Sequence, residues 1–81
     1  MAQYPRLVEA KYLGSYRLHI KFEDGREGVV DLSEDLWGDY RSALRDPTIF
    51  AAFFIDGDVL AWDNGAEFDS DDLYHQLNQI N

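Results

Sequence analysis

A cluster of acidic residues late in the chain is the first pattern that could do chemistry. Its members are Asp63, Glu67, Asp69, Asp71 and Asp72. A calcium-binding loop needs oxygen ligands at alternating positions, a central glycine and a closing glutamate. Asp69-x-Asp71 begins such a pattern, but Leu73 occupies the next ligand position and no glycine follows. We expect no bound metal and interpret the segment as a turn before a charged helix start. A ligand- or metal-sensing module centred on residues 63–75 is the alternative.

The two histidines lack the neighbours that catalysis or metal binding requires. His19 is flanked by Arg17 and Lys21, whose charges disfavour a protonated or metal-bound imidazole. His75 follows Asp71 and Asp72 by four and three residues, which is the spacing of a surface ion pair on a helix. The sequence has no Gly-x-Ser-x-Gly nucleophile elbow and no phosphate-binding glycine loop. We therefore expect no catalytic residues, no cofactor and no enzymatic activity.

The composition also bears on the cellular compartment. The chain has no cysteine, which excludes disulfides, thiolate metal sites and cysteine nucleophiles. Small secreted domains are usually stapled by disulfides, so this absence favours a reducing compartment. The first residues carry neither a basic run nor an apolar signal core. The longest apolar run, residues 49–55, is far shorter than the ~20 residues that span a bilayer. We expect a cytoplasmic protein that does not enter a membrane.

Charge is the property that says most about partners. The 81 residues carry a formal net charge of −9, and 46% of them are apolar, which fits one packed domain over residues 1–81. Residues 1–30 hold five basic and four acidic side chains, whereas residues 31–81 hold two basic and twelve acidic ones. Nucleic-acid binding depends on lysine and arginine, so we expect none directly. A basic protein is the partner that this charge favours, although solubility alone would also explain an acidic surface.

One segment contains the residue types that dominate protein interfaces, and a second resembles it. Tryptophan, tyrosine and arginine are enriched at binding hot spots. We predict a protein interface at Trp37, Tyr40, Arg41, Asp63 and Asn64. The alternative is that Trp37 covers the open face of a sheet while Arg41 pairs with Asp39 or Asp46. Trp62 stands at a strand end, and we expect it in the core.

A β-meander should support these residues. Residues 16–22 alternate apolar and basic side chains, which is typical of a half-buried strand, and residues 23–25 form a turn. A two-residue loop would place carboxylates on the apolar face. A three-residue loop with Gly25 in a left-handed conformation pairs Leu18 with Val30 and keeps Val30 buried, so we choose it. Residues 6–13 read as a preceding strand.

The first strand has a mixed pattern, and the rest of the chain alternates turns with short elements. We choose Val8, Ala10 and Tyr12 as the buried face of the first strand. Ser33 or Asp31 could cap a short turn, and residues 41–45 could add another. Asp46-Pro47 is a helix start, because aspartate caps well and proline suits the first helical position.

The final third of the chain is predicted as a hairpin and a helix. Residues 53–55 and 59–62 flank a turn at residues 56–58, but both faces are apolar, so the register stays open. A helix should begin at Ser70. Its apolar stripe, Leu73, Leu77 and Ile80, should pack on a sheet face. The predicted fold class is α+β, with an antiparallel meander, a second hairpin, a short middle helix and a closing helix.

A series of short motifs runs along most of the chain. They are Phe22-x-Asp24-Gly25, Val30-Asp31-Leu32, Leu44-x-Asp46-Pro47-x-x-Phe50, Trp62-x-Asn64-Gly65 and Leu73-Tyr74. Their order and spacing resemble the bacterial family catalogued as domain of unknown function 2442. The resemblance implies a small α+β fold with no assigned activity and no catalytic residues to carry over.

The resemblance also implies which domains and neighbouring genes accompany such proteins. Some members are fused to a helix-turn-helix, and some are encoded beside small proteins in the style of toxin–antitoxin pairs. Nothing follows Asn81 here, so we expect no DNA-reading helix. We expect a non-enzymatic protein-interaction domain, an antitoxin-like or regulatory partner of a small basic protein. Unpaired edge strands would also permit homodimerisation.

Overall fold

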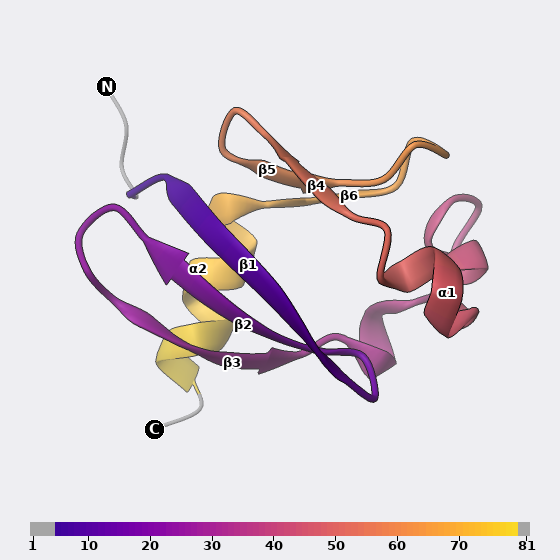
Figure 1. Cartoon of the computed structure of the whole chain (residues 1–81), viewed down its shortest axis with the longest axis horizontal. Coiled ribbons are helices and arrows are strands. Elements are labelled where there is room, and N and C mark those ends of the chain that lie inside the picture. Colours follow the sequence, from indigo (N-terminus) through magenta and orange to yellow (C-terminus); the bar gives the residue numbers. More distant parts are fainter. Residues whose placement is uncertain (1–4, 80–81) are drawn as a thin grey trace.

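Two small antiparallel sheets and one long helix make up the structure, a computed structural model that describes residues 5–79 and side chains as far as Leu77 (Figure 1). The first sheet contains β1 (Leu7–Gly14), β2 (Arg17–Phe22) and β3 (Glu27–Asp31). The second contains β4 (Phe54–Asp56), β5 (Val59–Ala61) and β6 (Glu67–Asp69). Between them lie 3₁₀ helices at Ser33–Asp35 and Arg41–Arg45 and the short α1 (Pro47–Phe50), and α2 (Ser70–Gln79) closes the fold. The predicted α+β class is confirmed.

The β2–β3 hairpin adopts the predicted register. Leu18 pairs with Val30, and Ile20 pairs with Gly28. The turn is closed by the Phe22 amide, which donates to the Arg26 carbonyl at 2.8 Å. Gly25 has a φ of +91°, the left-handed conformation that a three-residue loop requires and that glycine adopts without strain.

The buried face of β1 was predicted wrongly at one position. Leu7 is buried and pairs with Phe22, whereas Val8 is 52% exposed. The register of β1 against β2 shifts between Leu7 and Glu9, as at a β-bulge. An extra residue in one strand reverses the alternation beyond it, so Leu7 shares the inner face with the half-buried Ala10. Tyr12, also on that face, contacts Phe50 with ring centroids 5.4 Å apart.

The second sheet contains one strand more than the sequence predicted. Its hairpin has a two-residue loop, because Asp56 pairs with Val59 across Gly57, whose φ is +66°. The missed strand is β6, which pairs with β5 through Leu60 and Phe68. Leu60 and Phe68 are both buried, so the inner face of this sheet adds to the core.

Side-chain caps shape the segment between the sheets. An Asp31 carboxylate oxygen accepts from the Ser33 amide at 2.9 Å, so Asp31 is the residue that sets the first turn. The Asp46 carboxylate accepts from the Thr48 amide at 2.9 Å, and Pro47 occupies the first helical turn. The predicted helix start at Asp46-Pro47 and the predicted turn at residues 41–45 are confirmed.

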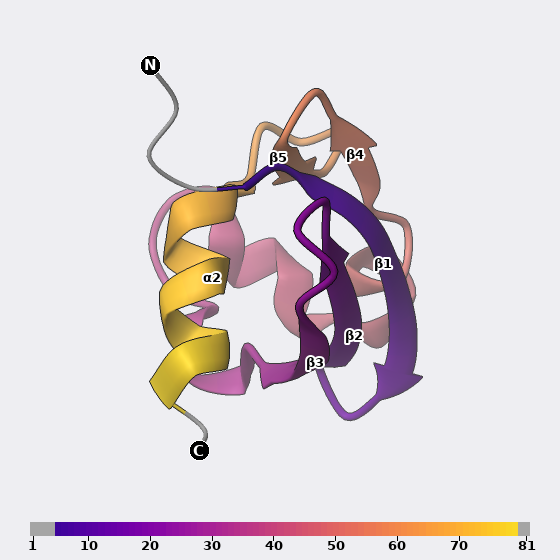
Figure 2. The same ribbon diagram turned by 90° about the vertical axis from the view of Figure 1, so that its left-hand side faces the viewer.

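Helix α2 starts at the predicted Ser70 and lies across the inner face of the first sheet (Figures 1 and 2). Leu73 and Leu77 are buried as predicted, while Ile80 lies outside the described residues. The helix approaches β3 closely at Gly28, where an added Cβ atom would come within 2.6 Å of Leu77 Cδ1.

Tyr74 ties α2 to the β2–β3 turn. Its hydroxyl donates to Asp24 at 2.9 Å, and its ring meets Phe22 edge-on with centroids 5.0 Å apart. The Arg26 guanidinium lies 5.3 Å from the centre of the Tyr74 ring. These contacts join α2 to the β2–β3 hairpin.

The core fills the space between the two sheets, α2 and the middle helices. Its fully buried members include Leu18, Ile20, Phe22, Leu44, Phe50, Leu60 and Leu73. Trp62 is 3% exposed, which confirms its predicted place in the core, and its indole Nε1 donates to the Phe50 carbonyl at 2.9 Å. Over the described residues, no helix has the length and apolar character needed to cross a membrane.

Candidate functional site

Two large aromatic side chains stand out from a loop that is fixed at both ends. Trp37 is 67% exposed and Tyr40 is 61% exposed. On one side, the buried Leu36 holds the loop to the core, and its carbonyl accepts from Arg45 Nε at 2.7 Å. On the other, the Tyr40 carbonyl accepts from Asn64 Nδ2 at 3.0 Å. The alternative that Trp37 covers the open face of a sheet is therefore wrong.

Arg41 binds the second sheet, and neither Asp39 nor Asp46 is the partner that the structure gives it. Its guanidinium carbon lies 3.9 Å from the centre of the Phe68 ring, a cation–π contact. Its Nη2 donates to the Glu67 carbonyl at 2.9 Å. Arg41 thus anchors the start of its helical turn to β6.

Asn64 joins the two segments of the predicted interface. Its Oδ1 accepts from the Ala66 amide at 3.0 Å, which shapes the turn between β5 and β6. Its Nδ2 makes the bond to Tyr40 described above. Asp63, the preceding residue, is exposed in the same turn. The structure therefore gathers all five residues of the predicted interface in one region.

Two open hollows border the turn between β5 and β6. The aromatic hollow, about 290 Å³, is lined by Trp37, Asp39, Tyr40, Arg41, Gly65, Ala66 and Glu67. The apolar hollow, about 310 Å³, is lined by Thr48, Ile49, Ala52, Trp62, Asp63 and Asn64. Consecutive residues of this turn belong to different linings, since Asp63 and Asn64 line the apolar hollow and Gly65 lines the aromatic one.

Sequence reasoning missed part of this surface. Ile49 is 40% exposed on α1 and lines the apolar hollow, and Glu67 on β6 lines the aromatic one. The sequence signal for Ile49 was an isoleucine in the first turn of the helix that starts at Asp46-Pro47. Glu67 was noted only as a member of the acidic cluster, because its place at this hollow depends on a strand that the sequence pattern did not predict.

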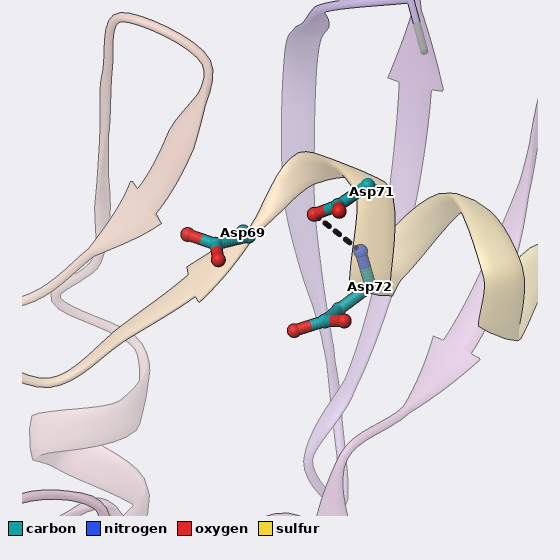
Figure 3. A group of neighbouring side chains, drawn as sticks. All are labelled: Asp69, Asp71 and Asp72. Atoms are coloured by element: carbon teal, nitrogen blue, oxygen red, sulfur yellow. Dashed lines mark hydrogen bonds between the residues drawn. The ribbon is translucent and has the colours of Figure 1, made fainter. Parts of the chain in front are cut away.

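The acidic trio, Asp69, Asp71 and Asp72, lies at the junction of β6 and α2 (Figure 3). One carboxylate oxygen from each lies within 4.8 Å of the others, and all three side chains are exposed. Oxygen atoms so arranged could contact a hard cation, but calcium sites use ~6–8 ligands. The Asp71 carboxylate accepts from the Asp72 amide at 3.0 Å. Carboxylates also stabilise a helix N-terminus, which accounts for the trio without an ion.

The histidines lie away from the hollows. His19 Nε2 is 3.1 Å from a Glu27 carboxylate oxygen on the neighbouring strand, so His19 has an acidic neighbour in addition to the basic ones that flank it in the sequence. The strand pairing supplies this carboxylate, because Glu27 follows the three-residue turn that sets the register. His75 is exposed on α2.

The groups with displaced pKa values serve the scaffold. The Arg26 amide bonded to Asp24 lowers the pKa of that carboxyl, and the Tyr74 hydroxyl adds to the effect. The Ser33 amide likewise lowers the pKa of Asp31. The hydrogen bond to Asp24 raises the pKa of Tyr74. Asp24 lies in a turn, Asp31 ends β3 and Tyr74 lies on α2, and none of the three lines either hollow.

The fold and the site define a small α+β domain with a preformed aromatic and acidic surface. Residues 7–79 match the profile of the family described as Protein of unknown function (DUF2442), so the chain belongs to this family, as its motifs indicated. No curated protein and no solved structure shows significant similarity to it.

Proposed function

We propose that the chain is a non-enzymatic interaction domain that binds a basic protein partner through the two hollows. The single observation that carries this proposal is that Trp37 and Tyr40 are both largely exposed and line the same hollow. Exposed apolar patches rimmed by polar groups mark interaction sites, and tryptophan and tyrosine dominate binding energy at such sites.

The loop that carries these rings is held before any partner arrives. Hydrogen bonds join Asn64 to Tyr40 and Arg45 to Leu36, and the guanidinium of Arg41 stacks on Phe68. A surface that is already ordered loses less conformational entropy on binding. This supports a binding role for the loop in preference to a role in packing.

Charge supports the choice of a basic partner. Asp39, Asp63 and Glu67 are exposed at the two hollows, and residues 31–81 carry twelve acidic side chains against two basic ones. Complementary charge steers association and penalises wrong partners. In its most specific form, the domain is an antitoxin-like or regulatory partner of a small basic protein in the cytoplasm, with no direct contact to nucleic acid.

The test is purification of the tagged chain from its native host, in parallel with two variants. Trp37→Ala/Tyr40→Ala removes the exposed rings, and Phe54→Ala is the matched control, because Phe54 is an exposed aromatic residue that lines neither hollow. We expect one basic protein in stoichiometric amount with the native chain and with Phe54→Ala, and its loss with the double variant. Elution of the native chain as an isolated monomer, or equal capture by all three, refutes the proposal.

A further inference from the structure

Building on the proposed function, we propose that this surface binds an extended segment of the partner that presents one basic and one aliphatic side chain. The basic side chain occupies the aromatic hollow, and the aliphatic side chain occupies the apolar hollow. The two hollows differ in lining chemistry, and this difference sets which side chain each one selects.

The aromatic hollow is suited to a cation. It offers the exposed ring of Trp37, which is the best aromatic partner for lysine or arginine, and the exposed ring of Tyr40. Its lining contains two carboxylates, Asp39 and Glu67, and a single guanidinium. The lining therefore keeps a net negative charge of one, and its guanidinium is held against the Phe68 ring.

The apolar hollow is suited to an aliphatic side chain. Its lining includes Ile49, Ala52 and the methyl-bearing Thr48, together with the largely buried Trp62. Burying an aliphatic side chain against such a lining releases ~25 cal/mol per Å² of apolar surface. Asp63 at its rim repels an acidic residue in the same position.

The connection between the hollows favours an extended segment. Asn64 and Gly65 are consecutive, and each lines a different hollow. The Asn64 amide, which lines the apolar hollow, is bonded to the carbonyl of Tyr40, which lines the aromatic one, so this bond ties the two linings together. In an extended chain, alternate side chains point to the same side, so a basic and an aliphatic residue separated by one residue both face the surface that the segment crosses.

Capped synthetic peptides test this inference directly. The probe contains arginine and leucine separated by one residue, in both orders, within a serine and glycine host. Matched probes replace arginine by glutamine, leucine by alanine, or arginine by glutamate. Binding is followed by amide chemical shifts of the labelled full chain. We expect each neutral replacement to weaken binding at least about fivefold, the scale of one cation–π or one buried aliphatic contact.

Two protein variants assign the side chains to their hollows. Trp37→Ala should abolish the preference for arginine over glutamine while it keeps the preference for leucine over alanine. Ile49→Ser should do the reverse, and Phe54→Ala should change neither. Both altered residues are exposed, so circular dichroism should show the native fold in each variant.

The outcomes separate this inference from the proposed function. Peptides that bind without preference for arginine or leucine, or that bind at neither hollow, overturn the inference. If the natural partner is still lost on Trp37→Ala/Tyr40→Ala, the proposed function as an interaction domain is supported, and only the inferred peptide specificity is wrong. If the peptides obey the rule but no basic protein is captured, peptide recognition stands and the proposed partner class is wrong.

Discussion

Trp62→Phe should destabilise the domain far more than Trp37→Phe, although the chemical change is the same. Trp62 is buried, and its indole N–H satisfies the Phe50 carbonyl at 2.9 Å, whereas Trp37 is 67% exposed. Phenylalanine keeps an aromatic ring in the core but leaves that carbonyl without its donor. The comparison therefore isolates the effect of place from the effect of residue type.

The magnitude follows from two contributions. An unsatisfied buried acceptor costs about 1–3 kcal/mol, and the smaller ring leaves a cavity that costs about 1 kcal/mol more. The total is about 2–4 kcal/mol, against ~4–12 kcal/mol for the stability of a domain this size. At ~4–8 °C per kcal/mol, the midpoint of thermal unfolding should fall by about 8–30 °C. Trp37→Phe should stay within ~0.5 kcal/mol of the native chain.

Thermal and urea unfolding followed by far-ultraviolet circular dichroism measure both variants under one set of conditions. Tryptophan fluorescence adds a second probe, because each variant retains a single indole in a known environment. Equal destabilisation by the two substitutions would refute the assignment of Trp62 to the core and of Trp37 to the surface.

Four further predictions concern the scaffold and the acidic trio. Leu7→Ala should cost about 2–4 kcal/mol and Val8→Ala less than ~0.5 kcal/mol in urea unfolding, and equal costs would contradict the β1 bulge. The contribution of Asp24, whose pKa is lowered, should be complete above pH 3.8 and disappear as the pH falls through its lowered pKa. That of Tyr74, whose pKa is raised, should be complete below pH 10.0 and disappear as the pH rises through its raised pKa. Tyr74→Phe should therefore remove the alkaline loss in a series of urea midpoints against pH, and a persistent loss would exclude this contact as its cause. Calcium at about 1 mM should raise the unfolding midpoint by less than ~2 °C, because the acidic trio has few ligands, and a larger rise would show a real site.

Local patterns predicted the β2–β3 hairpin because every relevant signal lies within it. The period-two alternation and Gly25 determine its turn and pairing without help from distant residues. The face of β1 could not be predicted in the same way, since Leu7 and Val8 are both apolar. Only the fit against Phe22 decides where the extra residue of the bulge lies. The third strand of the second sheet, with one apolar residue, is too short to show any period.

Residue types alone predicted most residues of the candidate site, but they did not predict the contacts that bring these residues together. Trp37 and Tyr40 were chosen because such residues dominate interfaces. The bond from Asn64 to Tyr40 and the stacking of Arg41 on Phe68 join residues more than twenty positions apart. Nothing in the sequence pattern indicates such pairs, so the two hollows became visible only in the folded chain.

The position of α2 has a consequence for how this protein is made in the cell. The helix supplies one wall of the core, although it is the last element of the fold to be translated. Until residues 70–79 leave the ribosome, Phe22 has no cover from Tyr74, and Gly28 on β3 has none from Leu77. A nascent or prematurely terminated chain therefore exposes the apolar face of this sheet. We expect chaperones and proteases to recognise that face, so incomplete chains should be degraded.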